Sequence, residues 1–171
     1  MSELLIGCGN QRQKLISFKE IPQEWSNDFV TLDMDETCGA DVIHDLNKLP
    51  LPFNDDRFDE IHAYEVLEHI GTQGDYRAFF NLFEEFYRIL KPEGWLIGTC
   101  PNFDSVWSFA DPGHTRIIAP QTLQFLSQKA YAEHVGNNAM SDYRHCYTAD
   151  FDIWAIQEGE HNYGFVMRAV K

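Results

Sequence analysis

Basic residues are scarce in this chain. Lysine and arginine total 13 against 27 aspartates and glutamates, which gives a formal net charge of −14 at pH 7. Binding to a nucleic-acid backbone depends on clustered lysine and arginine, and here these residues are scattered without a basic run. We therefore expect no nucleic-acid partner and favour a small or cationic ligand.

Cysteines are also few, and their positions exclude two kinds of site. The four are far apart and form no Cys-x-x-Cys pair: Cys8, Cys38, Cys100 and Cys146. This pattern predicts neither a zinc knuckle nor a disulfide framework. The group Asp142, His145 and Cys146 has no recognised ligand spacing, so no metal is predicted.

Long apolar runs are absent as well. No stretch approaches the ~18 apolar residues of a membrane span, and the sequence starts directly on a core-like strand rather than on a signal peptide. We therefore expect no membrane partner and a cytoplasmic location. The 171 residues, 44% hydrophobic and 14% aromatic, fit a single globular domain over residues 1–171.

Short apolar or alternating runs bounded by Gly, Pro, Asn and Asp predict seven strands. They lie at residues 3–6, 30–33, 41–43, 58–63, 95–100, 151–157 and 163–170. Aromatic residues at helical spacing predict a helix over residues 75–90, and Pro120 begins a second one. Residues 131–150 show no clear period and are expected to be irregular.

The order of these elements predicts the fold class. Alternation of strand and helix through residue 100 favours a parallel sheet with both faces covered. The last two strands are separated by only five residues, Glu158 to Asn162, which favours an antiparallel hairpin. We therefore expect an α/β protein with a Rossmann-like, doubly wound, seven-stranded sheet.

The first half of the chain carries a nucleoside-binding pattern. The first strand runs into Gly7-Cys8-Gly9, the second ends in Asp33, and Asp45-Leu46 follows the third. A Gly-X-Gly turn after one strand and a carboxylate after the next form a pocket for a ribose with a charged tail. A nicotinamide site shares these first elements, but it gives no reason for Asp45 or for Glu68-His69 after the fourth strand.

With these segments in order, the chain resembles the class I S-adenosylmethionine-dependent methyltransferases. The resemblance covers roughly residues 3–102 and includes Glu65-Val66-Leu67-Glu68-His69 and Leu90-Lys91-Pro92-Glu93-Gly94. It implies S-adenosylmethionine as cofactor. A fainter similarity, over Asp111 to Arg116, is to methyltransferases found near polysaccharide-modifying and phage genes.

The resemblance also implies a set of cofactor-binding residues. The turn from Gly7 through Cys8 to Gly9 would approach the methionine part, because glycine leaves bare backbone there. Asp33 would accept hydrogen bonds from both ribose hydroxyls, and Met34 would pack on the adenine. Asp45 and the Leu46 N–H would bind the edge of the adenine, and Glu65 would wall the methyl-transfer site. The alternatives are ordinary turn or helix-cap roles for the two aspartates.

Two histidines are the candidates for catalysis. Methyl transfer to oxygen or nitrogen requires a proton to leave the acceptor, and histidine suits that role near neutral pH. We predict His69 and His114, on opposite sides of the site, with His114 acting in a substrate clamp together with Asp111 and Arg116 or as a general base. The alternatives are a helix-ending histidine and a polar loop held by its own hydrogen bonds.

Two departures from the family pattern leave a second function open. Asn10-Gln11-Arg12-Gln13 stands where a third small residue is usual, and the sequence lacks the upstream helices that cover the cofactor in most relatives. The expected function is methyl transfer to a small-molecule or sugar-like acceptor. The alternative is a catalytically inactive binding module or partner subunit.

Overall fold

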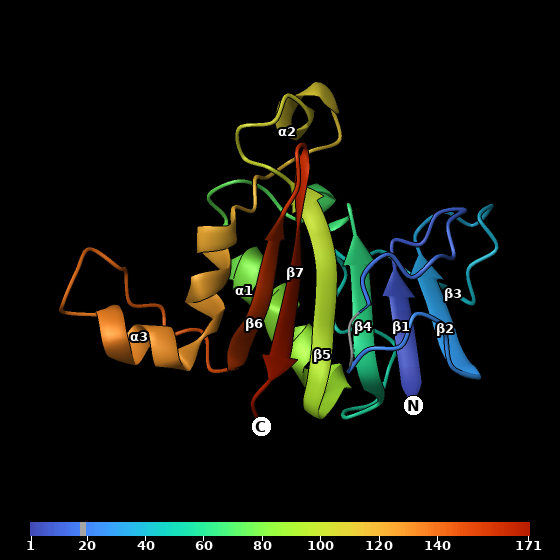
Figure 1. The fold of residues 1–171 in the computed structure, drawn as a ribbon, viewed down its shortest axis with the longest axis horizontal. Helices are drawn as coiled ribbons and strands as arrows, with labels where there is room; N and C mark the ends of the chain where they lie inside the picture. Colours follow the sequence, from blue (N-terminus) through green and yellow to red (C-terminus); the bar gives the residue numbers. More distant parts are fainter. Residues whose placement is uncertain (18–19) are drawn as a thin grey trace.

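The protein is built on one mixed sheet. The computed structural model describes residues 1–17 and 20–171, and within these residues seven strands pair in the order β3-β2-β1-β4-β5-β7-β6 (Figure 1). The strands are β1 (Ser2–Ile6), β2 (Asp28–Asp33), β3 (Val42–Ile43), β4 (Phe58–Tyr64), β5 (Leu90–Pro101), β6 (Phe151–Glu158) and β7 (Asn162–Ala169). Each strand predicted from the sequence is present, and the predicted fold class is confirmed.

Strand direction follows the prediction too. The strands β3, β2, β1, β4 and β5 are parallel, whereas β7 is antiparallel to both β5 and β6. In register, Ile6 lies beside Leu32 on one side and Ala63 on the other. The carboxyl ends of β1, β2 and β4 therefore meet at one edge of the sheet, where ligands bind in open α/β folds.

One face of the sheet is covered by helical segments. Helix α1 (Tyr76–Ile89) begins at Asp75, whose carboxylate accepts the Ala78 N–H at 3.0 Å. Its aromatic face is buried, with Phe83 and Phe86 fully enclosed. This confirms the helix predicted over residues 75–90. Burial of each such side chain stabilises the fold by roughly 1.5–3 kcal/mol.

The remaining helical segments are short. They are η1 (Leu67–His69), α2 (Trp107–Ala110), η2 (Pro120–Leu126) and α3 (Gln128–His134). The helix expected from Pro120 is a 3-10 helix, and α3 occupies part of the region expected to be irregular because the Ser127 hydroxyl caps it at Ala130 N. In the described part of the chain, no helix has the length and apolar character needed to cross a bilayer.

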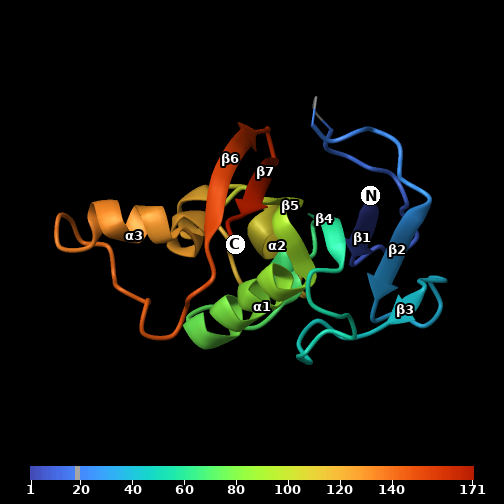
Figure 2. The same ribbon diagram turned by 90° about the horizontal axis from the view of Figure 1, so that it is seen from below.

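The prediction that strand and helix alternate throughout the first 100 residues is wrong for the segment between β1 and β2. Strand–helix alternation fails between β1 and β2, because no helix forms in residues 7–17 or 20–27. This segment instead passes along the other side of the sheet from α1 (Figure 2). Ile21 from this segment packs with Ile97 and Val166 in a second, smaller core.

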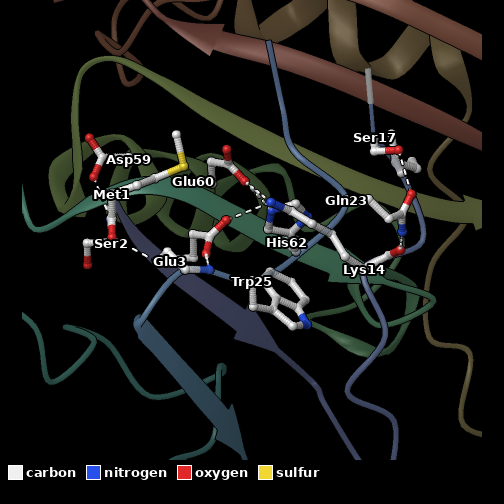
Figure 3. A network of polar contacts seen from close by, with 12 residues as sticks. Met1, Ser2, Glu3, Lys14, Ser17, Gln23, Trp25, Asp59, Glu60 and His62 are labelled. Atoms are coloured by element: carbon white, nitrogen blue, oxygen red, sulfur yellow. Dashed lines mark hydrogen bonds and ion pairs between the residues drawn. The ribbon is translucent and has the colours of Figure 1, made fainter. Parts of the chain in front are cut away.

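A buried lysine holds this segment on the sheet. Lys14 Nζ lies 2.6 Å from Glu3 Oε1 on β1 and 2.6 Å from Glu60 Oε2 on β4, with the side chains of Lys14 and Glu3 fully buried (Figure 3). Its ammonium also lies 5.0 Å from the centroid of the Trp25 ring. Burial alone would raise the pKa of Glu3, but hydrogen bonds from Lys14 and Ser26 outweigh it and lower that pKa. We call Lys14, Glu3 and Glu60 the lysine clamp.

The lysine clamp continues into a chain of aromatic side chains. His62 Nε2 donates to Glu60 Oε2 at 2.9 Å, and its Nδ1 lies 2.7 Å from the Tyr64 hydroxyl. Burial lowers the pKa of His62, so the ring is neutral and can accept the Tyr64 O–H. The Tyr64 oxygen in turn accepts the Ile16 N–H at 3.3 Å. The segment is thus bound at both Lys14 and Ile16.

Lys14→Met is expected to lower the free energy of unfolding by about 3–5 kcal/mol, because it leaves two buried carboxylates without their cation. Urea denaturation followed by circular dichroism measures this loss. Lys129→Met, at an exposed position on α3, is the matched control and should change stability by less than about 1 kcal/mol. Equal losses in the two variants would contradict the role given to the lysine clamp.

Candidate functional site

The candidate site begins at the turn after β1. Gly7 and Gly9 have φ of +59° and +44°, a region that glycine adopts without strain. A Cβ on Gly7 would lie 2.3 Å from Val66 Cγ2, so this position also needs glycine for packing. A Cβ on Gly9 would meet nothing within 4 Å. The turn therefore presents bare backbone to open space at Gly9.

Two charged side chains hold this turn. Asp33, at the end of β2, accepts the Gly9 N–H at 2.7 Å through Oδ2 and the Asp35 N–H at 2.9 Å through Oδ1. The Arg12 guanidinium donates to the carbonyls of Gly9 at 2.6 Å and Cys38 at 3.0 Å. Arg12 thus binds carbonyl groups of a turn that does not continue into a helix. In the sequence, Arg12 is recognisable only as part of a departure from the family pattern.

Most of the residues predicted to bind the cofactor surround one cavity. It has a volume of about 310 Å³. Among its lining residues are Gly7, Gly9, Asp33, Met34, Asp45, Leu46, Glu65 and His69. Met34 is 67% exposed, which leaves its side chain accessible to a ligand. Their arrangement around one space agrees with the prediction, while the role of each residue stays a prediction.

Of the residues predicted to bind the cofactor, Asp45 lines the first cavity and Cys8 does not. Asp45 Oδ1 accepts from Asn47 N at 2.9 Å and from Asn47 Nδ2 at 3.1 Å, and these hydrogen bonds lower the pKa of Asp45. Cys8 is buried, and burial raises the pKa of its thiol to about 11. It does not line the first cavity but a neighbouring one of about 500 Å³, together with Gly7 and Gly9.

A third cavity opens beyond the end of β4. It has a volume of about 530 Å³ and shares Glu65 and His69 with the first cavity. Its other lining residues are Glu68, Pro101, Trp107, Ala110, Asp111, Pro112 and His114. We call it the acceptor cavity. Glu65, between the two spaces, has a positive φ of 52°, a strained conformation that is often found at functional sites.

The two predicted catalytic histidines lie together. The ring centroids of His69 and His114 are 4.6 Å apart at an interplanar angle of 78°. The expectation that they lie on opposite sides of the site is therefore wrong. The cause is the backbone pairing of Thr115 N and Arg116 N with the Glu68 carbonyl, at 3.0 and 3.1 Å. This pairing brings the 111–116 segment onto η1.

Glu68 is buried beside these histidines. Its side chain is 2% exposed, its Oε1 lies 3.8 Å from His114 Nε2, and neither of its oxygens has a hydrogen-bond partner in the described part of the protein. Burial, with the nearby negative charges of Glu65 and Asp111, raises the pKa of Glu68 to about 8. A carboxyl group with this pKa beside a cavity is typical of functional sites.

Arg116 does not act in a clamp at the acceptor cavity. Its guanidinium is largely buried and donates to the carbonyls of Thr72 at 2.9 Å and Asp75 at 2.8 Å. Asp111 Oδ1 accepts the Gly113 N–H at 2.7 Å, and its Oδ2 lies 3.9 Å from His114 Nε2. Arg116 therefore stabilises the loop before α1, and of the predicted clamp only Asp111 and His114 line the acceptor cavity.

Comparison with known proteins agrees with this architecture. The family described as "Methyltransferase domain" matches residues 4–98. The probable methyltransferase PMT5 of Arabidopsis thaliana is 38% identical over 58 residues, which make up 34% of this chain and 9% of that protein. The present chain therefore aligns with only a small part of this curated relative.

Solved structures share the fold over nearly the whole chain. A SAM-dependent methyltransferase from Archaeoglobus fulgidus has a TM-score of 0.57 at 17% identity, covering 98% of this chain and 86% of that one. The N-methyltransferase NodS from Bradyrhizobium japonicum WM9, in complex with S-adenosyl-L-homocysteine, has a TM-score of 0.56 at 13% identity, covering 99% and 78%. Because the family match covers more than half of the chain, the protein belongs to the methyltransferase domain family, and its resemblance to class I S-adenosylmethionine-dependent methyltransferases is confirmed.

Proposed function

We propose that this protein transfers a methyl group from S-adenosylmethionine to an oxygen or nitrogen of a small-molecule or sugar-like acceptor. The observation that carries the proposal is the pair of cavities that meet at Glu65 and His69. One has the residues expected for a nucleoside, and the other has titratable groups and an aromatic wall. Such adjacent spaces fit a reaction in which two ligands must meet.

The residues around the first cavity fit S-adenosylmethionine. Asp33 offers carboxylate oxygens to ribose hydroxyls, Met34 an apolar surface to the adenine, and Asp45 an acceptor to the adenine amino group. The open space at Gly9, where even a Cβ would meet nothing within 4 Å, leaves room for the methionine part. The family membership and the S-adenosyl-L-homocysteine in the structure of NodS support the same assignment.

S-adenosylmethionine supplies a methyl group on a positively charged sulfur, and on transfer the C–S bond breaks with its electron pair left on sulfur while the acceptor loses a proton. The chain contributes position and proton acceptance. Glu68, His69 and His114 line the acceptor cavity and are the groups able to take that proton. Trp107, which is 56% exposed at the same cavity, offers an aromatic face to the acceptor.

Asp33→Ala tests the nucleoside site. Charge-assisted hydrogen bonds contribute about 1.5–3 kcal/mol each, so the variant is expected to bind S-adenosyl-L-homocysteine about 10- to 100-fold more weakly by isothermal titration calorimetry. Asp35→Ala is the matched control, because Asp35 caps its own turn at Thr37 and does not line the cavity. If the wild-type protein binds neither S-adenosylmethionine nor S-adenosyl-L-homocysteine, the inactive binding module is the better description.

Arg12→Met tests whether the turn is held in its binding conformation by the guanidinium. We expect about tenfold weaker binding of S-adenosyl-L-homocysteine. The carbonyls of the turn lose charge-assisted hydrogen bonds, and a net loss of about 1.4 kcal/mol corresponds to that factor. Arg77→Met, at an exposed position on α1, serves as the control in the same titration. Unchanged affinity in Arg12→Met would show that the turn keeps its shape without this side chain.

A further inference from the structure

Three metal-ligating side chains converge at the acceptor cavity. One ligand atom from each of Glu68, His69 and His114 lies within 4.8 Å of the other two. The first two residues come from η1, and the third from the loop after α2. No metal was predicted from the sequence, where the group considered was Asp142, His145 and Cys146 and the pairing of Glu68-His69 with the distant His114 has no local signal.

The polar atoms of this cluster lack partners that they need. Both oxygens of Glu68 and Nδ1 of His114 are buried and make no hydrogen bond with the described part of the protein. The side chains of Glu68 and His114 are 2% and 9% exposed. The distance from Glu68 Oε1 to His114 Nε2, 3.8 Å, is too long for a hydrogen bond. Buried polar groups are nearly always satisfied, so the two unpartnered oxygens of Glu68, with His114 Nε2 3.8 Å from one of them, indicate a ligand from outside the chain.

One nitrogen of His69 is held by the backbone. Its Nδ1 lies 3.0 Å from the Gly113 carbonyl oxygen, which can only accept, so Nδ1 is the donor and Nε2 is the nitrogen left for a metal. Metal-binding histidines are commonly held in this way by a carbonyl or carboxylate on the other nitrogen. The backbone pairing of Thr115 N with the Glu68 carbonyl fixes the second histidine's loop against the first.

Two similar clusters show why this one is distinctive. Glu3, Glu60 and His62 also lie close enough to hold an ion, but Lys14 already supplies a cation to both carboxylates. In the cluster of Cys8, Asp33 and Cys38, both oxygens of Asp33 accept backbone N–H groups. The carboxylate oxygens of Glu68 accept no hydrogen bond from the described residues and form no ion pair with a lysine or arginine there, and the nearest basic nitrogen, His114 Nε2, is 3.8 Å away.

We propose that Glu68, His69 and His114 bind a divalent transition-metal cation, Zn²⁺ or Mn²⁺, which takes a hydroxyl oxygen of the acceptor as a further ligand. Two imidazoles and one carboxylate suit such cations and leave coordination positions open. The acceptor cavity that these three residues line also includes Glu65, which it shares with the first cavity. Of the oxygen and nitrogen acceptors allowed above, this cation site favours one with a hydroxyl group. The choice of acceptor rests on the proposed function.

The cation would make the acceptor a better nucleophile. Coordination lowers the pKa of a bound hydroxyl. With the cation in place, the lone pairs of the three side chains are occupied, so the hydroxyl proton leaves to water instead of to these side chains. The acceptor oxygen retains the electron pair that forms the new bond to the methyl carbon. The C–S electron pair remains on sulfur, and the cation is unchanged. The positive charge also compensates Glu68, which forms no ion pair with a lysine or arginine among the described residues and whose nearest basic nitrogen is His114 Nε2 at 3.8 Å.

The test is a direct titration of the full chain after chelator treatment and dialysis. Mn²⁺ binding is followed by the EPR signal of the free ion, and Zn²⁺ binding by calorimetry. We expect one cation to bind per chain, with affinity about tenfold or more weaker in Glu68→Gln and in His114→Ala. His145→Ala, at an exposed histidine outside the acceptor cavity, is the matched control and should bind as the wild type does.

Two further measurements separate the possible failures. Circular dichroism establishes that each variant is folded, and calorimetry with S-adenosyl-L-homocysteine establishes that the nucleoside site is intact. Binding of S-adenosyl-L-homocysteine without any cation would overturn this inference and leave the proposed function standing. Cation binding that is equal in all four proteins would place the ion elsewhere on the acidic surface and also overturn it. Loss of S-adenosyl-L-homocysteine binding in the wild type would instead overturn the proposed function.

Discussion

The rest of the structure depends on one buried cation between two strands. Lys14 lies against Glu3 on β1 and Glu60 on β4, and all three residues are almost completely excluded from water. Charges in such an environment are costly unless each is paired. The lysine clamp therefore fixes the irregular segment after β1 on a face of the sheet that in a doubly wound fold is covered by helices.

This attachment determines how the nucleoside site is made. In Rossmann-type sites the glycine turn leads into a helix whose N-terminus binds the charged part of the ligand. Here no helix follows the turn in the described part of residues 7–27. Asp33 holds the turn through the Gly9 N–H, and Arg12 holds it through the carbonyl groups. Side chains thus replace a helix as the support, and the turn keeps its positive φ angles at Gly7 and Gly9.

The strands and helix α1 were predictable from the sequence. The path of the irregular segments, after Gly9 and around His114, was not. Alternating apolar residues located the strands, and the aromatic spacing located α1, because both patterns are set by local geometry. The absence of a helix after Gly9 had no comparable local signal. Charged Glu3 and Glu60 inside apolar strands hinted at a buried pair, but their partner lies in a segment without periodicity. Gly7, Gly9, Asp33 and Asp45 were predictable because consecutive parallel strands end at one edge, whereas the contact of His114 with η1 depends on the path of a long loop.

Among the described residues, buried carboxylates lie in the lysine clamp and at Glu68, and the two places differ in what compensates their charge. In the lysine clamp the compensating charge is covalently part of the chain, so the carboxylates contribute to folding and are unavailable to a ligand. At Glu68 the surrounding side chains are two histidines and two further acids, Glu65 and Asp111, and among the described residues no lysine or arginine forms an ion pair with it. A burial cost that folding leaves uncompensated must be met by protonation or by a ligand. Because this carboxyl borders the cavity beside the nucleoside site, either answer places proton or cation chemistry where the acceptor binds.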